Sequence, residues 1–480
     1  MDRKVKIVAT LGPSSNSYET IRDLITAGIN VARLNFSHGT HQEHADIIQM
    51  IRSVSRELNS HVAILQDLQG PKIRVGVLPS PLDLLTEDEV CLFASGSEDE
   101  SKGSHQCIPV DFEELFSIVH AGEQILLDDG RIELKVIEVN GLQVTARVVI
   151  GGRLTSHKGI NLPGVSTNII GFTEKDKSDL IFGMSQNVDM VAISFVRSPH
   201  DVLTVKESIK EISQSKQGPL LIAKLEKPEA LENLDAILDA SDGVMVARGD
   251  LGVEIPPERV PTAQKRIILE ANRRRKIVIT ATQMLDSMIS SPLPTRAEAS
   301  DVANAVFDGT DAVMLSGETA SGSYPVESVT MMSRIIKEAE GNFKDWGHFD
   351  RSDLLTDDDA IAITRAACEL AQDLNVAAIA VFTHTGRSAI LMSKMRADVP
   401  IYAFTSVESV LNRLAALWGV RPVLVPMEKT IREMINNASH YLLETEKFAP
   451  TKQVVVIGGF PAEAIRPPNM ALLHTLGEVL

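Results

Sequence analysis

Two groups of charged residues indicate the chemistry of this chain, because each follows an apolar run typical of a buried strand. Lys224 and Glu226 follow one run, and Asp250 follows the next. Carboxylates are hard oxygen ligands that suit Mg²⁺ (or Mn²⁺) and leave positions open for substrate oxygens. A lysine ammonium beside them would attract an anionic group, although a salt bridge between Lys224 and Glu226 at a solvated rim is the alternative. These residues predict a divalent metal site that handles an anionic substrate.

Further cations favour a phosphate-bearing substrate. Arg33 follows another apolar run and Arg74 lies further along the chain. Guanidinium groups bind phosphate or carboxylate oxygens in a bidentate manner. A metal together with Lys224, Arg33 and Arg74 is typical of phosphoryl transfer, in which catalysis is mainly positioning and charge neutralisation. Neither a P-loop nor a glycine-rich kinase loop is present in the sequence, so other elements would have to bind a nucleotide.

Three further polar residues could carry a proton. Thr282, Ser316 and Glu318 each follow a strand-like run. Their hydroxyls and carboxylate could relay a proton directly or through water. The alternative is that Thr282 and Ser316 merely cap the helices that follow them.

Eight short apolar runs separated by amphipathic segments position these residues. Such alternation predicts an α/β fold with a closed (β/α)₈ TIM barrel, whose functional residues lie at the C-terminal ends of the strands. The runs are Ile7–Ala9, Val31–Ala32, Val62–Leu65, Met190–Ile193, Leu220–Ala223, Val244–Ala247, Ile277–Ile279 and Ala312–Leu315. Nearly every run ends in a polar side chain, which a solvated rim explains poorly.

Two further domains are expected. The connection between the third and fourth runs is far longer than an ordinary loop. Its alternating runs and glycine-containing turns predict an inserted β-rich lid domain at residues 71–170, placed over the barrel mouth. The barrel would then comprise residues 1–70 and 171–345. A new alternation of strands and helices at 355–480 predicts a C-terminal open α/β domain of regulatory type.

Composition limits the classes of partner. The 480 residues include 47 Lys and Arg against 64 Asp and Glu, a formal net charge of −17. This balance disfavours nucleic acid and anionic membrane surfaces as partners. The 3 cysteines lack metal-ligand spacing. We found no secretion signal or membrane span in the sequence, so a cytoplasmic protein is expected.

Seven sequence blocks resemble the pyruvate kinase family, and together they are highly specific. They run through nearly the whole predicted barrel and into the lid. The blocks are residues 30–39 (NVARLNFSHG), 67–74 (DLQGPKIR), 158–164 (KGINLPG), 241–252 (SDGVMVARGDLG), 281–288 (ATQMLDSM), 294–298 (PTRAE) and 314–319 (MLSGET).

This resemblance implies transfer of the phosphoryl group of phosphoenolpyruvate to ADP, giving pyruvate and ATP in glycolysis. It implies that Glu226 and Asp250 hold Mg²⁺, and that a proton path involves Thr282, Ser316 and Glu318. It further implies a homotetramer. The implied substrate-binding residues are Arg33, Lys224, Gly249, Asp250 and Thr282, and the implied nucleotide-binding residues are His38, Arg74, Lys158 and Asn35.

Lys72 departs from the potassium-dependent members of this family. By resemblance, the monovalent-cation site comprises Asn35, Ser37, Asp67 and Leu68. Potassium-dependent members resemble Thr-Lys-Gly-Pro-Glu-Ile-Arg-Thr, whereas residues 68–75 read Leu-Gln-Gly-Pro-Lys-Ile-Arg-Val. The Lys72 ammonium would replace the charge of the ion, so we predict that K⁺ is not required. The alternative is a solvated lysine with K⁺ still bound.

The C-terminal domain matches the family only in part. Residues 383–388 (THTGRS) resemble the effector domain of the family, whereas residues 458–468 depart from its usual ending, which puts effector activation in doubt.

Two other functions compete with pyruvate kinase activity. A magnesium-dependent barrel aldolase or lyase is one alternative, but it would not need the lid or Lys158. A catalytically silent scaffold is another, against which the intact Lys224, Glu226, Asp250 and Thr282 argue.

Overall fold

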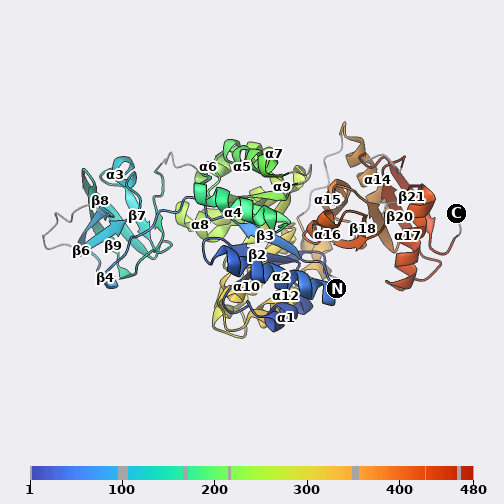
Figure 1. Cartoon of the computed structure of the whole chain (residues 1–480), viewed down its shortest axis with the longest axis horizontal. Coiled ribbons are helices and arrows are strands. Elements are labelled where there is room, and N and C mark those ends of the chain that lie inside the picture. Colours follow the sequence, from blue (N-terminus) through green and yellow to red (C-terminus); the bar gives the residue numbers. More distant parts are fainter. Residues whose placement is uncertain are drawn as a thin grey trace.

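Eight parallel strands close into a barrel at the centre of the molecule (Figure 1). The computed structural model describes residues 3–95, 106–165, 171–213, 218–348, 356–426, 429–461 and 466–478. In barrel order the strands are β1 (Lys6–Leu11), β2 (Val31–Asn35), β3 (Ala63–Asp67), β12 (Met190–Ile193), β13 (Leu220–Leu225), β14 (Gly243–Ala247), β15 (Ile277–Ala281) and β16 (Ala312–Leu315). The predicted (β/α)₈ barrel is confirmed, and each predicted run coincides with one strand to within a few residues.

Helices surround the barrel and begin where the sequence provides caps. Helix α1 (Tyr18–Ala27) begins after Ser17, whose side chain accepts a hydrogen bond from the Thr20 amide, and it ends at Gly28 in the left-handed conformation. Such caps satisfy the amide and carbonyl groups that a helix end leaves without partners. The other helices of the barrel are α2 (His41–Glu57), α4 (Glu174–Ser185), α5 (Pro199–Ile212), α6 (Pro228–Glu232), α7 (Leu234–Ala240), α8 (Arg248–Glu254), α9 (Val260–Arg273), α10 (Arg296–Phe307), α11 (Gly317–Ala320), α12 (Pro325–Gly341) and α13 (Phe343–Trp346), with 3₁₀ turns η1 (Pro257–Arg259) and η2 (Asp286–Ile289).

A repeated polar contact fixes the N-terminal end of the barrel. A side chain that directly precedes every second strand accepts a hydrogen bond from a backbone amide of the strand before it. The pairs are Asn30 with Ile7, Asp189 with Ile64, Asp242 with Leu221, and Asp311 with Val278, at 2.7 to 3.1 Å. Buried amides that begin a strand need such a partner. This end of the barrel is therefore built for structural stability.

The inserted domain leaves the barrel after β3 and is built almost entirely of strands. Its main sheet has the order β11-β7-β8-β9-β5-β6, and β10 pairs with β4. The elements are β4 (Leu82–Leu84), β5 (Glu89–Ala94), β6 (Gln106–Val110), α3 (Leu115–Ile118), β7 (Gln124–Leu127), β8 (Ile132–Asn140), β9 (Gln143–Ile150), β10 (Gly152–Leu154) and β11 (Ile160–Asn161). Figure 1 shows this domain beside the barrel rather than folded over it. The β-rich insertion is confirmed.

The C-terminal domain is an open sheet with the order β19-β18-β17-β20-β21. Four strands are parallel and β21 runs antiparallel to β20. The elements are α14 (Asp359–Asp373), β17 (Ala378–Phe382), α15 (Arg387–Lys394), β18 (Ile401–Thr405), α16 (Glu408–Leu414), β19 (Val420–Leu424), α17 (Ile431–Glu444), β20 (Gln453–Gly458) and β21 (Met470–Thr475). The open α/β domain is confirmed. The antiparallel strand β21 departs from the simple alternation of strands and helices that the sequence predicts.

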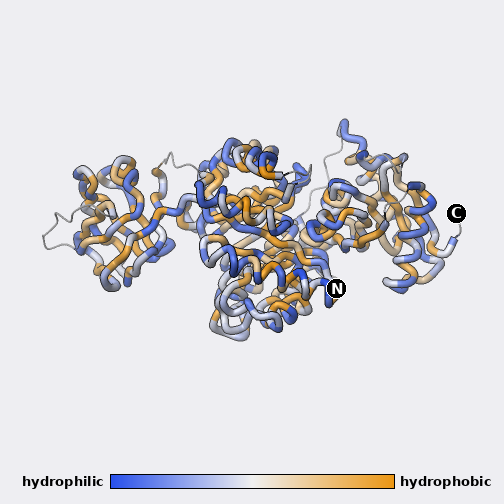
Figure 2. The backbone as a smooth tube through the Cα atoms, viewed as in Figure 1, coloured by the Kyte–Doolittle hydropathy of each residue, from blue (hydrophilic) through white to orange (hydrophobic). Residues whose placement is uncertain are grey.

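Apolar packing joins the barrel to the C-terminal domain. Val8, Leu65 and Met245 from the barrel strands belong to one buried cluster with Leu417 and Val420 of the C-terminal domain. Figure 2 shows apolar residues along the strands of both domains. The inserted domain has a separate core.

Among the helices in the described ranges, none has the length and apolar character to cross a membrane. The expected domain junctions near residues 170 and 350 fall on segments outside the described ranges.

Candidate active site

Lys224 lies at the centre of a polar cluster at the C-terminal ends of the barrel strands. It is the next-to-last residue of β13, and its side chain is 11% exposed. Its Nζ lies 2.8 Å from Glu226 Oε1 and 3.3 Å from Asp67 Oδ1, and it donates a hydrogen bond of 2.7 Å to Ser194 Oγ. Strands β3, β12 and β13 are neighbours in the barrel, and for this reason their ends bring these groups together.

Arg33 joins the same cluster from β2. Its Nε donates to Asp67 Oδ2 at 2.7 Å, and its Nη1 donates to the Thr10 hydroxyl at 2.9 Å. The Thr10 hydroxyl in turn donates to the carbonyl of Leu315. Asp67 thus lies between two cationic side chains, those of Arg33 and Lys224. These contacts hold the guanidinium group of Arg33 and the ammonium group of Lys224 at fixed positions in the barrel mouth.

The charges of the cluster stabilise one another. Burial alone would lower the pKa of Lys224, but Asp67, Glu226 and Asp250 raise it above its ordinary value. Burial would likewise raise the pKa of Asp67, yet Lys224 and Arg33 hold it below its usual range. Lys224 is therefore a permanent cation, and Asp67 a permanent anion, at physiological pH.

Asp67 pairs with both Arg33 and Lys224, whereas the carboxylates of Glu226 and Asp250 could bind a further cation. Burial raises the pKa of Glu226, and the nearby Asp250 carboxylate adds to this effect against the opposing charge of Lys224. The Glu226 Oε2 accepts a hydrogen bond of 2.6 Å from the Phe195 amide, which fixes the carboxylate. Asp250 lies in the first turn of α8. Two neighbouring carboxylates, one with its negative form disfavoured, fit a divalent cation that would relieve their repulsion.

The described residues hold no group of three or more His, Cys, Asp or Glu that could bind a metal. A metal at Glu226 and Asp250 would therefore take its remaining ligands from water or substrate oxygens. This is the usual arrangement for Mg²⁺, which retains several non-protein ligands. The donor set consequently fits Mg²⁺ better than a metal that requires a complete protein cage.

Thr282 lies in a strained turn directly after β15. Its φ is +66° and that of Gln283 is +55°. Such values are unfavourable for a β-branched residue, and they persist only where neighbouring contacts enforce them. The Thr282 hydroxyl accepts a hydrogen bond of 2.7 Å from the Gly249 amide and donates to the Ala281 carbonyl. Gly249 and Thr282 are thereby brought together at the start of α8, next to Asp250.

Arg248 enforces this turn, and sequence reasoning did not identify it as a site residue. Its guanidinium donates to the carbonyls of Ala281 at 3.2 Å and Thr282 at 2.8 Å. It also forms an ion pair with Asp301 at 2.7 Å. None of these contacts has a short-range signal in the sequence, since the partners lie more than thirty residues away. The position of Arg248 at the end of an apolar run was the available indication.

Ser316 and Glu318 follow β16 and lie close to each other. The Glu318 carboxylate accepts hydrogen bonds from the amides of Leu285 at 3.0 Å and Ser316 at 2.7 Å. Burial raises the pKa of Glu318 despite these bonds. Among the buried polar atoms of the described residues, Ser316 Oγ has no hydrogen-bond partner. Among the described residues, no hydrogen bond joins Ser316 or Glu318 to Thr282, so their joint proton path stays a prediction.

The residues predicted to hold a monovalent cation lie where β2 and β3 end. Asn35 Oδ1 accepts from the Ser37 amide at 3.2 Å, and the Leu68 carbonyl accepts from Ser194 Oγ at 2.8 Å. Lys72 forms an ion pair with the inserted domain. Its Nζ lies 3.5 Å from Asp129 of the inserted domain. The predicted replacement of K⁺ by Lys72 is therefore not visible as a direct contact.

The predicted nucleotide-binding residues are divided between the barrel and the inserted domain. His38 follows β2 and remains accessible to solvent, and partial desolvation of its ring, together with the charges of Arg74, Lys72 and Arg33, lowers its pKa. Arg74 donates to the carbonyl of His157 at 3.0 Å, and Lys158 forms an ion pair with Asp128 at 2.7 Å. Arg74 and Lys158 thus bond within the inserted domain, and their cationic groups would need to exchange partners to bind a phosphate.

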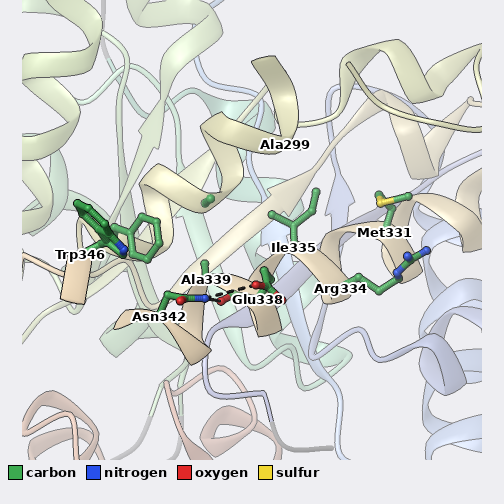
Figure 3. Close-up of a pocket in the computed structure, with 10 residues that line it drawn as sticks. Ala299, Met331, Arg334, Ile335, Glu338, Ala339, Asn342 and Trp346 are labelled. Carbon is green, nitrogen blue, oxygen red and sulfur yellow. Dashed lines mark hydrogen bonds between the residues drawn. The ribbon is translucent and has the colours of Figure 1, made fainter. Parts of the chain in front are cut away.

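A large cavity lies apart from this cluster. It has a volume of about 670 Å³ and is lined by α10, α12 and the region of Trp346 (Figure 3). Ile335 and Met331 are among its apolar lining residues, and the Asn342 amide donates to the Glu338 carbonyl beside it. None of the polar residues at the barrel mouth lines this cavity.

Comparisons with known proteins agree on one family. The model of the pyruvate kinase barrel domain matches residues 2–329, and that of the pyruvate kinase alpha/beta domain matches residues 361–474. A pyruvate kinase of Staphylococcus epidermidis is 43% identical, and one of Staphylococcus aureus is 44% identical, each over 99% of this chain and 81% of the relative. The crystal structure of a pyruvate kinase from Cryptosporidium parvum has a TM-score of 0.89 at 34% identity, covering 99% of this chain and 96% of that one.

Proposed function

The chain belongs to the pyruvate kinase family and is a phosphotransferase, and on this premise we propose that it transfers the phosphoryl group of phosphoenolpyruvate to ADP. The products would be pyruvate and ATP. The observation that carries the proposal is the cluster in which Lys224 contacts Asp67, Glu226 and Ser194 beside Arg33. Fixed cations next to two carboxylates suit a phosphorylated carboxylic acid that binds together with a divalent metal.

Glu226 and Asp250 would hold Mg²⁺ (or Mn²⁺). When bound, the metal would neutralise charge on the phosphate and the enolate oxygen. The fixed carboxylate of Glu226, held by the Phe195 amide, would set the position of the ion. The Gly249 amide and Asp250 in the first turn of α8 would lie against the carboxylate end of the substrate.

Lys224 and Arg33 would bind the phosphoryl group. Because Lys224 remains charged, its ammonium can stabilise negative charge on the phosphoryl oxygens as transfer proceeds. Arg33 is oriented by Asp67 and Thr10, so it would need little reorganisation to bind phosphate. Such preorganised charges stabilise a transition state more effectively than mobile ones.

The enolate left after transfer needs a proton. Thr282 is held in its strained turn beside Gly249 and would deliver the proton from its hydroxyl or from water. Ser316 and Glu318 would supply the path behind it. The raised pKa of Glu318 favours this role, since a carboxyl that retains its proton closer to neutral pH is a better proton donor.

The nucleotide would bind between the barrel and the inserted domain. His38 and Asn35 on the barrel would face Arg74 and Lys158 of the inserted domain when that domain closes. Lys158 would then exchange Asp128 for a phosphate oxygen. Closure would also exclude water from the phosphoryl donor.

Further features of the family are proposed for this chain. Lys72 would take the place of K⁺ near Asn35, Ser37, Asp67 and Leu68 once the inserted domain closes, and it would then exchange Asp129 for this group. We further propose a homotetramer that acts in the cytoplasm. Light scattering of the purified chain would test the tetramer.

The experiment for the metal and the reaction measures pyruvate and ATP together. With Mg²⁺ we expect equal amounts of both, and a chelator should stop both. Glu226→Gln should raise the Mg²⁺ concentration for half-maximal rate at least about tenfold, because a ligand charge is lost. The exposed Glu207→Gln is the matched control. Release of pyruvate and inorganic phosphate without ATP would indicate hydrolysis of phosphoenolpyruvate rather than transfer to ADP, and activity that withstands the chelator would refute the metal site.

A further inference from the structure

Asn161 connects the inserted domain to the barrel through a buried carboxylate. Asn161 ends β11, and its Nδ2 donates a hydrogen bond of 2.9 Å to Glu254 Oε1. Glu254 is the last residue of α8, and its side chain is only 3% exposed. The same oxygen accepts from Lys227 Nζ at 2.7 Å. A carboxylate that is buried and paired in this way has a fixed position, so it can serve as an anchor.

Both barrel partners of Asn161 adjoin the proposed active site. Lys227 follows Glu226 in the chain, and Glu254 ends the helix whose first turn contains Gly249 and Asp250. In Figure 1, α8 lies at the edge of the barrel that faces the inserted domain. The anchor is therefore only a few residues from the proposed metal ligands.

The inserted domain approaches the same helix with a tight turn. This turn connects β7 to β8 and contains Asp128, Asp129 and Gly130, the last two with φ of +55° and +83°. A Cβ added at Gly130 would lie 3.7 Å from a methyl of Val253, so the turn packs against the last turn of α8. The ion pairs of Asp128 with Lys158 and Asp129 with Lys72 tie the turn to the base of the domain.

These contacts lie beside the point where the chain enters the inserted domain, which would serve as the hinge in the proposed closure. A cavity of about 40 Å³ separates the two domains here, and its lining includes Pro71, where the chain enters the inserted domain, together with Asn161 and Lys227. A contact next to a pivot moves little when the domain rotates. It can consequently persist through closure and define the axis of that motion.

We propose that Asn161, Glu254 and Lys227 form a hinge latch that positions the inserted domain against α8. The proposal rests on the proposed function, because the latch would place Arg74 and Lys158 for the nucleotide. Glu254 and Asn161 are positioning residues here, since neither is expected to touch a substrate. Loss of the latch should weaken nucleotide binding, while the barrel residues still bind phosphoenolpyruvate and Mg²⁺.

Steady-state kinetics of Asn161 variants test the latch. We expect Asn161→Ala to raise KM for ADP about tenfold, because one hydrogen bond to a charged group contributes a free energy of this size. Binding of phosphoenolpyruvate and Mg²⁺ should be unchanged. Asn161→Asp should have a larger effect, because two carboxylates would then face each other. Adding Glu254→Gln should partly restore that variant. The exposed Asn140→Ala in the same domain is the matched control.

Two outcomes of these kinetics would overturn the latch. One is an Asn161→Ala variant that is indistinguishable from Asn140→Ala. The other is an Asn161→Asp variant that Glu254→Gln does not restore, since a merely structural role gives no such charge-specific coupling.

A distance measurement separates failure of the latch from failure of the proposed function. Spin labels at the exposed Glu138 of the inserted domain and Lys210 of α5, in a Cys107→Ser background, report the domain position without any activity. Asn161→Ala should broaden the distance distribution. An unchanged distribution would refute the latch even if the chain transfers phosphoryl groups, whereas a broadened one in a protein without pyruvate kinase activity would refute only the function.

Discussion

Three carboxylates act on the ammonium group of Lys224 at the barrel mouth. Asp67 and Glu226 contact its ammonium directly, and Asp250 adds to the field that raises its pKa. The sequence indicated Lys224 and both proposed metal ligands, because all three follow apolar runs. It did not indicate that Asp67 joins Lys224 to Arg33, since a contact between strand ends depends on the order and register of the barrel.

Lys72 provides the residue-scale prediction. Lys72→Glu should create a requirement for K⁺ that the unaltered chain lacks. The substitution removes the ammonium proposed to replace K⁺ and introduces a carboxylate that attracts the ion. The rate of pyruvate formation is measured against K⁺ concentration, and Lys177→Glu, an exposed position, is the control. We expect a rise of at least about tenfold in the variant on adding K⁺. An identical dependence on K⁺ in both proteins would refute the role of Lys72.

At the scale of elements, the strands were predictable and several contacts between them were not. Met190–Ile193 and Ala312–Leu315 were predicted with the observed bounds, because parallel barrel strands are buried on both faces and read as continuous apolar runs. Strand β21 was missed, since it is a partly exposed edge strand with a weak pattern. The turn at Thr282 was also unpredictable, because a positive φ at threonine arises from distant contacts rather than from local preference.

The Thr282 turn gives the element-scale prediction. Arg248→Lys should lower kcat about 10- to 100-fold, because a single ammonium cannot reproduce the guanidinium bonds to Ala281, Thr282 and Asp301. Thr282 would then be less well placed to deliver its proton. The measurement is kcat, with the melting temperature as a check on folding and the exposed Arg266→Lys as control. A kcat equal to that of the unaltered chain would show that Arg248 does not position the turn.

At the scale of the whole molecule, the C-terminal domain closes the N-terminal end of the barrel. Lys394 and Arg396 form ion pairs with Asp311, the residue that precedes β16. Lys6 at the start of β1 donates to the carbonyl of Val420 at 2.8 Å. These contacts lie at the opposite end of the barrel from Lys224. The contacts with the C-terminal domain and the proposed active site therefore lie at opposite ends of the barrel, as is usual for TIM barrels.

The buried Lys6 gives a pH-dependent prediction. Burial lowers its pKa from the ordinary 10.5 to about 7. The folded chain thus holds this proton less tightly than the unfolded chain, so the charged lysine destabilises the fold fully below about pH 7. The penalty decreases as the pH rises towards 10.5. Lys6→Met should raise the melting temperature relative to the unaltered chain by roughly 2 °C or more near pH 6, with a smaller difference near pH 10.

Thermal unfolding across this pH range provides the check. Lys177→Met, at an exposed position, should show no pH-dependent difference from the unaltered chain. A Lys6→Met difference that stays constant between about pH 6 and pH 10 would contradict the assigned titration of Lys6.

The most direct test of the account is the rate of pyruvate formation from phosphoenolpyruvate and ADP with Mg²⁺, in buffer free of potassium and ammonium. We predict the full rate in this buffer and no further increase when K⁺ is added to the same sample. Activity that begins only with K⁺ would retain phosphoryl transfer but contradict the role of Lys72. Absence of pyruvate formation both before and after the addition would contradict the function proposed for the Lys224 cluster.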